Sequence, residues 1–229
     1  MEAQFERNEI IIGKEKQKII ESKSVAIFGV GGVGSFAAES LARAGIGTII
    51  LIDNDTISLT NLNRQLIALH STIGKYKVDV MKERILDINP NINVITYKQF
   101  IENNNSQSIL SKHKIDYIVD AIDTVKSKLE LIKFANSLNI PIISSMGTGN
   151  KLHPELLEIT DIYKTSVCPL AKKIRKELKS LNIKRLNVVY SKEEPIKSIQ
   201  DTQIIGSISF VPSCAGLLIT SKIINDFIK

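Results

Sequence analysis

The chain has 229 residues, of which 43% are hydrophobic and 24% charged, so it can bury a substantial core and has the composition of an ordinary globular protein. Its two cysteines, Cys168 and Cys214, lie far apart and outside any CxxC motif, which excludes an intrachain disulfide framework and a four-cysteine zinc site. The first residues lack the layout of a signal peptide, and the longest weakly polar run, residues 208–220, contains a proline and is too short to span a bilayer. We therefore expect a cytoplasmic protein without stable membrane insertion.

The net charge of +6 is concentrated in one segment. Residues 164–185 carry eight basic side chains and one acidic side chain, so the rest of the chain is close to neutral. Such an asymmetry indicates a localised anionic partner rather than a protein that binds anions over its whole surface.

Apolar strands alternate with helices through the first two thirds of the chain. Residues 1–23 look helical and charged. Further helices are expected at 33–44, 75–88, 107–113 and 126–138, and strands at 24–28, 48–52, 93–97, 117–122 and 140–144. This alternation predicts an α/β fold, Rossmann-like, with a mainly parallel sheet and helices on both faces. Beyond residue 150 the pattern weakens without a linker, so we expect a single domain, 1–229, with a nucleotide-binding core (1–150) and a C-terminal elaboration (151–229).

A glycine-rich turn joins the strand at 24–28 to the helix that follows it. Its glycines are Gly29, Gly31, Gly32 and Gly34. Such a turn needs one glycine at positive φ, one that lets backbone N–H groups reach a phosphate, and one that lets helix and strand pack closely. Asp53 ends the next strand, 19 residues after Gly34, where a carboxylate accepts hydrogen bonds from a ribose. The pattern predicts a nucleotide site, the alternative being a tight turn without a ligand.

The stretch from Asp53 to Gln65 is more polar than a dinucleotide site requires. It contains two carboxylates (Asp53 and Asp55), four amides and the guanidinium of Arg64. An NAD site needs only the first acid, whereas additional amide and arginine donors suit a ligand with more phosphate charge, such as a triphosphate. Taken singly, the asparagines would be turn residues and Arg64 a surface charge. Taken together beside a nucleotide turn, they favour contact with such a ligand.

Four separately placed motifs carry a resemblance to a known superfamily. They are GVGGVGS, LIDNDTISLTNLNRQ, GKYKVDVMKERILDINP and VDAIDT, and the match extends over about residues 4–150. In this respect the chain resembles the ubiquitin-activating-enzyme-like (ThiF/MoeB/HesA) superfamily. The resemblance implies an enzyme that uses ATP and Mg²⁺ to adenylate a carboxylate.

The resemblance also implies a role for each matching residue. Gly29, Gly31, Gly32 and Gly34 would shape the nucleotide loop, Asp53 would hold the ribose with Asp55 in the same site, and Asn61, Arg64 and Lys77 would contact phosphates. Asp123 would lie beside Mg²⁺ and the α-phosphate. Arg7 would reach into the ATP site of a partner subunit, which implies a homodimer. Arg64, Lys77, Asp123 and Arg7 are therefore the expected catalytic residues.

The cysteines and the last third of the chain distinguish branches of this superfamily. Branches that activate carrier proteins usually contain CxxC zinc pairs, which this chain lacks. The sequences ITDIYKTSVCPLAKKIRKELK, NVVYSKEEP and GSISFVPSCAGL resemble the tRNA threonylcarbamoyladenosine dehydratases. That family commonly has Asp where this chain has Cys168, a position at a helix start that could stabilise a thiolate but is more simply structural. Cys214 lies in an apolar run and is expected to be a core thiol.

The expected helix at 169–181 separates apolar and basic side chains. Leu170, Ile174, Leu178 and Leu181 fall within a stripe about 80° wide. The basic side chains on the other side are Lys172, Lys173, Arg175, Lys176 and Lys179. Charge alone slightly favours a solvated lysine-rich face, but together with the resemblance it favours binding to a tRNA backbone.

The resemblance implies one reaction. ATP would adenylate the carboxylate of N6-threonylcarbamoyladenosine at position 37 of certain tRNAs, and an atom of the same side group would then displace AMP to give a cyclic product. Such an intramolecular attack needs no enzyme nucleophile. A sulfur-carrier adenylyltransferase, an NAD(P) oxidoreductase and a non-catalytic RNA-binding module remain as alternatives. Some relatives also suggest a sulfur-transfer (cysteine desulfurase system) partner.

Overall fold

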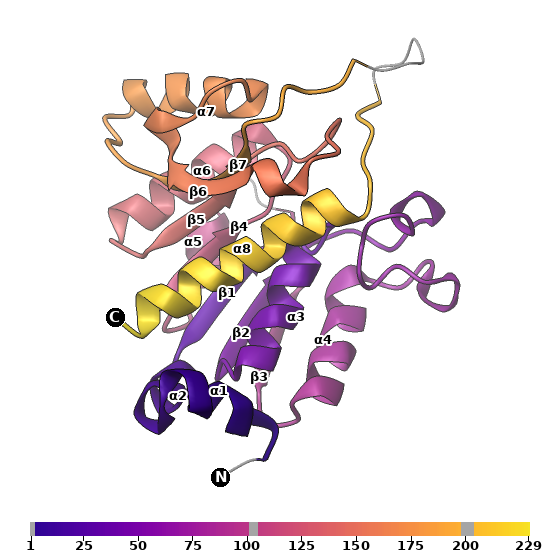
Figure 1. Ribbon diagram of the computed structural model, residues 1–229, viewed down its shortest axis with the longest axis vertical. Helices are drawn as coiled ribbons and strands as arrows, with labels where there is room; N and C mark the ends of the chain where they lie inside the picture. The colour runs from indigo at the N-terminus through magenta and orange to yellow at the C-terminus, as the bar shows by residue number, and fades with distance from the viewer. Residues whose placement is uncertain (1–2, 101–104, 198–203) are drawn as a thin grey trace.

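The computed structural model describes residues 3–100, 105–197 and 204–229, and within these ranges seven strands form one sheet (Figure 1). Its order is β3-β2-β1-β4-β5-β7-β6. The strands are β1 (Ser24–Phe28), β2 (Thr48–Ile52), β3 (Asn93–Tyr97), β4 (Tyr117–Asp120), β5 (Ile142–Ser145), β6 (Leu157–Asp161) and β7 (Asn187–Ser191). Each neighbouring pair is parallel except β6–β7, which is antiparallel. The predicted α/β fold with a mainly parallel sheet is therefore confirmed.

Helices cover both faces of the sheet, as predicted. The α-helices are α1 (Glu6–Ile12), α2 (Lys14–Glu21), α3 (Gly34–Ala44), α4 (Lys77–Ile88), α5 (Asn105–Leu110), α6 (Val125–Ser137), α7 (Pro169–Ser180) and α8 (Phe210–Phe227). Helices α3, α4 and α8 pack on one face, and α5, α6 and α7 pack on the other (Figure 1). The helix expected at 1–23 is divided at Gly13, which has a φ of 83°; residues 1 and 2 lie outside the described ranges.

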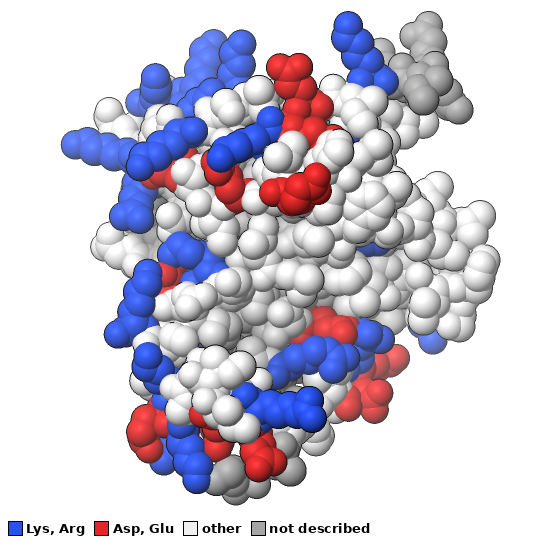
Figure 2. Space-filling model, in the orientation of Figure 1, with Lys and Arg blue, Asp and Glu red and all other residues white. Residues whose placement is uncertain are grey.

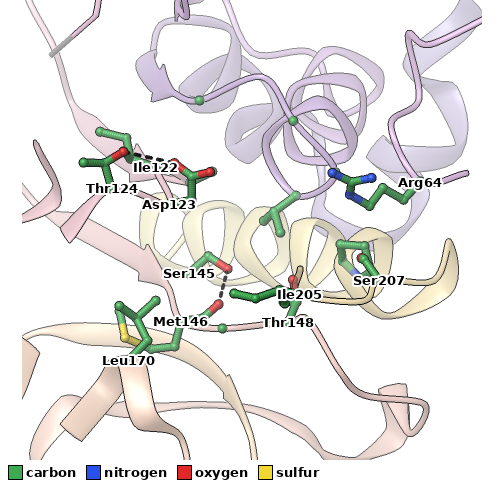
Figure 3. A pocket seen from close by; sticks show the side chains of 18 of the residues that line it. Arg64, Ile122, Asp123, Thr124, Ser145, Met146, Thr148, Leu170, Ile205 and Ser207 are labelled. Carbon is green, nitrogen blue, oxygen red and sulfur yellow. Dashed lines mark hydrogen bonds between the residues drawn. The ribbon is translucent and has the colours of Figure 1, made fainter. Parts of the chain in front are cut away.

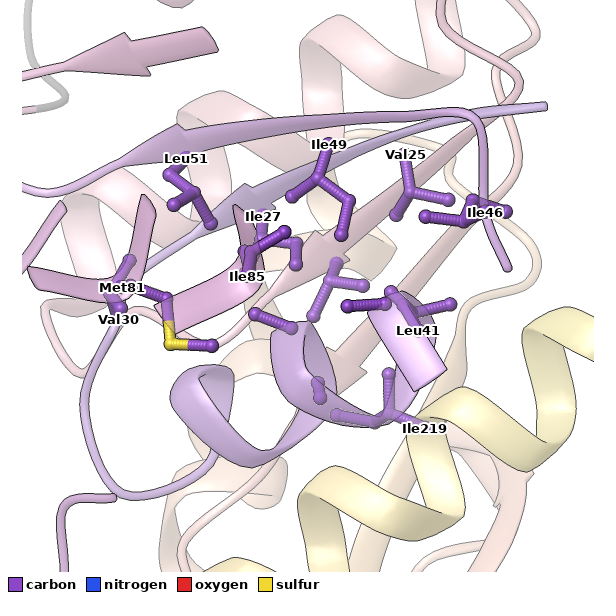
Figure 4. Packing of buried hydrophobic residues seen from close by; sticks show 14 of the residues in the cluster. Val25, Ile27, Val30, Leu41, Ile46, Ile49, Leu51, Met81, Ile85 and Ile219 are labelled. Carbon is purple, nitrogen blue, oxygen red and sulfur yellow. The ribbon is translucent and has the colours of Figure 1, made fainter. Parts of the chain in front are cut away.

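The core explains why the central strands are apolar along their whole length. Successive residues of β1 point to opposite faces, so Val25 and Ile27 pack with α3, α4 and α8, whereas Ala26 and Phe28 pack with α5 and α6. All four side chains have no exposed surface. Figure 4 shows the first of these layers, where Ile27 lies among residues of α3, α4 and α8. Each of the larger side chains, Val25, Ile27 and Phe28, contributes about 1.5–3 kcal/mol by its burial.

Several element boundaries differ from the sequence prediction, including those of α5, which was expected at 107–113, and three of the differences have a local cause. The helix expected from residue 75 begins at Lys77, because Lys75 and Tyr76 pair instead with the Thr56–Ile57 segment. The strand expected at 117–122 ends at Asp120, whose side chain accepts a hydrogen bond from the Ile122 backbone and turns the chain. The strand expected at 140–144 begins at Ile142, after a proline that has no N–H to donate.

The last third of the chain extends the sheet and then returns to its first half. Strands β7 and β6 add to the edge of β5, and α8 crosses back to pack on α3 (Figure 1). Two contacts fix this packing. Thr220 Oγ1 donates to the Ala37 carbonyl at 3.2 Å, and a side chain at Gly216 would overlap the Val33 carbonyl oxygen. In the described parts of the chain, no helix combines the length and the apolar character that crossing a membrane would require.

Candidate functional site

The strand order creates a crevice at the carboxyl ends of β1 and β4. From β1 the chain moves outward to β2 and β3, and from β4 it moves in the opposite direction, so the loops after these two strands diverge. Gly29, directly after β1, has a φ of 89°, and a Cβ there would lie 2.6 Å from the Ala121 carbonyl oxygen after β4. At Gly34 a Cβ would overlap the Gly29 carbonyl oxygen. These two glycines therefore allow the turn and the close approach of α3.

A pocket of about 780 Å³ occupies this crevice. Its lining comes from two parts of the chain, which face one another in Figure 3. We call the lining residues between 29 and 127 the glycine-loop half and those between 145 and 212 the C-terminal half. The glycine-loop half includes Gly29, Gly31, Gly32, Asp53, Asp55, Arg64, Gln65, Lys77 and Asp123. The C-terminal half includes Ser145, Met146, Gly147, Lys151, Cys168 and Leu170.

Asp53 and Lys77 lie at the base of the glycine-loop half. The two carboxylate oxygens of Asp53 accept hydrogen bonds from the Val30 backbone at 2.7 Å and the Asp55 backbone at 2.8 Å. Burial raises the pKa of Asp53, and the nearby Lys77 opposes that shift. Lys77 is 5% exposed and pairs with Asp55 at 2.6 Å. The pocket thus presents a carboxylate and an ammonium group whose positions are fixed.

Arg64 and Gln65 stand on the other side of the glycine turn. The Nη1 of Arg64 donates to the Thr60 carbonyl at 3.0 Å and to Asn63 Oδ1 at 2.9 Å, which holds the guanidinium at the pocket wall (Figure 3). Gln65 is 7% exposed, and its buried Oε1 has no hydrogen-bond partner among the described residues. Gln65 is not among the predicted site residues, although it directly follows Arg64 in the NLNRQ motif.

Asn61 does not line the pocket, contrary to its predicted contact with phosphates. Its Oδ1 accepts a hydrogen bond from the Ser58 backbone at 3.0 Å, which closes a capping box on the short 3₁₀ helix Leu59–Asn61. This local hydrogen bond accounts for an asparagine at this position without any contact to a ligand. Asn61 instead supports the loop that carries Arg64.

Asp123 projects into the pocket from the loop after β4, on the opposite side from Arg64 (Figure 3). Its Oδ1 accepts a hydrogen bond from Thr124 Oγ1 at 3.2 Å. The side chain is otherwise exposed to the pocket, and among the described residues no cluster of three or more His, Cys, Asp or Glu could hold a metal. A metal ion here would therefore depend on Asp123 together with oxygen atoms of a ligand.

A buried ion pair lies between the strand ends that carry the two halves of the pocket. Lys128 Nζ lies 2.8 Å from Asp120 Oδ2, and both side chains are fully buried. Lys128 also donates to the Ser145 carbonyl at 3.0 Å, and Ser144 Oγ donates to Asp120. Asp120 precedes the loop of Asp123, and Ser145 begins the C-terminal half. The pair therefore fixes the ends of β4 and β5 relative to one another.

Lys151 and Cys168 are buried in the C-terminal half. Each is 3% exposed. The Lys151 ammonium donates to the Glu193 backbone carbonyl, and burial lowers the pKa of Lys151, while Cys168 and Glu193 oppose the shift. Cys168 precedes Pro169 at the start of α7, as predicted. Cys214 lies on α8, half-buried against the core, which is consistent with the expected packing role.

Arg7 lies on α1 and does not reach the pocket of its own chain. Helices α1 and α2 lead into the amino end of β1, whereas the pocket is at the carboxyl ends of the strands (Figure 1). Arg7 is exposed, and the neighbouring Ile10 and Ile11 are 79% and 84% exposed. Of the predicted catalytic residues, one chain therefore brings together Arg64, Lys77 and Asp123 only.

The basic surface on α7 has a different composition from the one predicted. Its exposed lysines are Lys172, Lys173, Lys176 and Lys179, and they contribute to the positive cluster over α7 in Figure 2. Arg175 is half-buried, because its Nη1 donates to the Ile162 and Thr165 carbonyls. On the packed side, Ala171 joins Ile174 and Leu178 in the core, whereas Leu170 lines the pocket and Leu181 is 38% exposed.

The glycine turn between β1 and α3, with an acid at the end of β2, defines a Rossmann-like nucleotide-binding protein. Residues 5–227 match the ThiF family, and the chain belongs to this family. It is 43% identical over 242 residues to the tRNA threonylcarbamoyladenosine dehydratase of Bacillus subtilis (strain 168), which covers 99% of this chain and 95% of that protein.

Solved structures of a bacterial relative superimpose over nearly the whole chain. The Escherichia coli tRNA N6-threonylcarbamoyladenosine dehydratase, TcdA, in complex with AMP has a TM-score of 0.92 and 33% sequence identity, and the similarity covers 98% of this chain and 93% of that one. The complex of the same enzyme with ATP has a TM-score of 0.91 at the same identity and coverage. The similarity therefore includes the C-terminal third.

Proposed function

We propose that the protein is an ATP-dependent tRNA threonylcarbamoyladenosine dehydratase. The observation that carries the proposal is the single pocket in which a nucleotide turn faces a second, differently lined half. An enzyme that activates one substrate with ATP must hold both ligands in contact. The named relatives support this substrate, because their similarity extends through the residues that form the C-terminal half.

ATP binding is supported by the charge and geometry of the glycine-loop half. The turn at Gly29–Gly34 leads into the start of α3, where backbone N–H groups and the helix dipole favour phosphate. Asp53 retains lone pairs for ribose hydroxyls beyond its two backbone bonds. Arg64 and Lys77 supply positive charge for the phosphates. Gln65, with its unpaired buried Oε1, adds an acceptor to the same site.

Mg²⁺ fits the site if the nucleotide supplies most of its ligands. Mg²⁺ in nucleotide sites is usually bound by one or two carboxylates plus phosphate oxygens and water. Asp123 is the carboxylate positioned for this role, since Asp53 and Asp55 bond to backbone and Lys77. The ion would supply neutralisation of the charge that develops on pyrophosphate.

Two bond changes then account for the loss of one water. A carboxylate oxygen of the threonyl group attacks the α-phosphorus and pyrophosphate leaves, which gives an acyl adenylate. An atom of the same carbamoyl side group then attacks the activated carbonyl carbon, loses its proton and displaces AMP. The protein must hold two anions together in the first step, and Arg64 and Lys77 provide the charge for this. The second step is intramolecular and needs no protein nucleophile.

The tRNA would be held by the lysines of α7 and a second subunit would supply Arg7. The four exposed lysines suit salt-dependent contacts to phosphates. Arg7 lies beside exposed isoleucines on α1, which a second copy of the chain would cover. We also propose a cytoplasmic location, because the proposed substrate is a tRNA. Contact with a sulfur-transfer protein is proposed because of the resemblance to the dehydratase family.

The test is pyrophosphate exchange and nucleoside mass spectrometry on the same reaction. Purified protein, ATP and tRNA that carries threonylcarbamoyladenosine should give labelled ATP from labelled pyrophosphate, and the digested tRNA should contain a nucleoside lighter by one water. tRNA without the modification is the control and should give neither signal. Exchange that requires a small carrier protein and ignores tRNA would contradict the proposal.

A further inference from the structure

Lys151 is the one charged side chain among the described lining residues of the C-terminal half. The remaining lining there is made of small, apolar and neutral polar side chains, among them Gly147, Cys168, Leu170 and Ile205. The glycine-loop half, by contrast, has five charged residues. A single basic residue in an otherwise uncharged lining indicates recognition of one negative charge.

The surroundings of Lys151 hold its charge without a direct ion pair. Among the described residues, its ammonium donates to the Glu193 backbone carbonyl and forms no direct ion pair with a carboxylate. The Glu193 carboxylate is engaged elsewhere, because its two oxygens accept the Leu152 backbone N–H at 2.9 Å and the His153 backbone N–H at 3.0 Å. A buried cation is costly unless an anion compensates it. A direct ion-pair partner for Lys151 is therefore expected from the ligand.

We propose that Lys151 binds the carboxylate of the substrate before it is adenylated. This inference rests on the proposed function, which places a free carboxylate in this pocket. The phosphates of ATP already have Arg64, Lys77 and the glycine turn on the other side. A threonyl carboxylate carries one negative charge, which matches one ammonium group, and the apolar surroundings of Lys151 strengthen that attraction.

The chemistry also predicts which kinetic constant depends on Lys151. Adenylation converts the carboxylate into a neutral ester carbonyl, so the ion pair exists in the bound substrate and weakens as the bond to phosphorus forms. An interaction that is at least as strong in the bound substrate as in the transition state lowers KM without raising kcat. Loss of Lys151 should therefore raise KM for the modified tRNA and change kcat little.

The direct test compares two ligands and three proteins. The ligands are an anticodon stem-loop that carries threonylcarbamoyladenosine and the same stem-loop with its carboxylate converted to a carboxamide. The wild-type protein should bind the acid about 10- to 100-fold more tightly than the amide, as expected for one charge-assisted hydrogen bond. Lys151→Met should bind both ligands like the wild-type protein binds the amide. Lys16→Met, on the exposed face of α2, is the matched control and should keep the preference.

Each alternative result overturns the inference. Lys151→Met that still prefers the acid would show that another group binds the carboxylate. If Lys151→Met fails to bind an ATP analogue or unfolds at lower temperature, Lys151→Arg tests the same point, because it keeps the charge and should retain the preference. A wild-type protein that dehydrates the modified tRNA without distinguishing acid from amide contradicts this inference alone. A wild-type protein that does not dehydrate it contradicts the proposed function as well.

Discussion

In the glycine-loop half of the pocket, charged groups are held by their neighbours, whereas the C-terminal half contains one ammonium group without a carboxylate partner among the described residues. Asp55 pairs with Lys77, Asp53 accepts two backbone hydrogen bonds, and Arg64 is held by its own loop. Among the residues that the structure describes, Lys151 donates its hydrogen bond to a carbonyl oxygen. The first arrangement suits a ligand with several charges at fixed spacing. The second suits a ligand that supplies its own charge to complete the site.

The largest expected effect is a loss of stability when the buried ion pair beneath the two halves of the pocket is broken. Lys128→Met should lower the free energy of unfolding by about 3–5 kcal/mol, because it leaves the Asp120 carboxylate buried and unpaired. Chemical denaturation monitored by circular dichroism measures this value. Lys133→Met, exposed on the same helix, should change stability by less than about 0.5 kcal/mol.

A second substitution makes this prediction more specific. Asp120→Leu combined with Lys128→Met removes both charges and should recover much of the lost stability. Equal destabilisation by the single and double variants would show that the pair does not hold β4 and β5 together through its charge.

The glycine-loop half should dominate the rate of the first chemical step. Asp123→Ala should lower kcat for pyrophosphate exchange by about 100- to 1000-fold, the usual cost of one group that stabilises developing charge. Affinity for tRNA should stay unchanged, because Asp123 lies in the pocket and not on α7. Asp87→Ala, an exposed acid on α4, is the control for the loss of a carboxylate. Full activity of Asp123→Ala would place the metal elsewhere.

The exposed lysines of α7 should affect the binding of tRNA and not the rate of the chemical steps. Replacing Lys172, Lys173, Lys176 and Lys179 by Gln should weaken tRNA binding and reduce its salt dependence by up to about one unit of log–log slope for each lysine that contacts a phosphate. Filter binding at several salt concentrations measures both. Arg175→Gln should instead destabilise the fold, because it removes bonds to two carbonyl groups, and leave the slope unchanged. An unchanged slope in the lysine variant would contradict the tRNA surface.

The smallest predicted change is a partial recovery of activity, which tests whether a second subunit completes the glycine-loop half. Arg7→Ala and Asp123→Ala should each have strongly reduced activity alone. After equal amounts are mixed and allowed to exchange subunits, about one quarter of wild-type activity should return, because one quarter of the sites then combine an intact Asp123 with an intact Arg7 from the partner. Mixtures that remain inactive, with hybrid dimers confirmed by native mass spectrometry, would exclude this role for Arg7.

The same two halves also differ in how far the sequence predicts them. Buried strands and the glycine turn are local patterns, so β1, β2 and β3 were expected at their observed bounds. Gly45 ends α3 in a left-handed conformation, for which glycine is the usual residue. Arg64, Lys77 and Asp123 lie in one pocket because the Rossmann-like strand order places the carboxyl ends of the strands side by side. Asn61 caps its own turn, and its local sequence does not distinguish that role from the predicted binding of a ligand.

The C-terminal half depends on contacts between distant residues. Lys151 is buried by its contact with Glu193, and Arg175 turns inward because the Ile162 and Thr165 carbonyls lie beside it. Neither neighbour is predictable from helical or strand periodicity. The antiparallel pairing of β6 with β7 is also a tertiary feature, which explains why the alternating pattern weakened after residue 150.

Gly216 has a consequence for how the protein can be divided. Because it has no side chain, α8 lies directly against the first turn of α3, the same turn that follows the glycine loop. Val211, Ala215 and Ile219 of α8 belong to the same buried cluster as Val30 of that loop. A fragment that ends near residue 150 would keep every nucleotide-binding motif but would expose the apolar back of the loop to water. The helix made by the last residues is thus part of the scaffold for a motif near the beginning of the chain, and a minimal nucleotide-binding fragment should retain it.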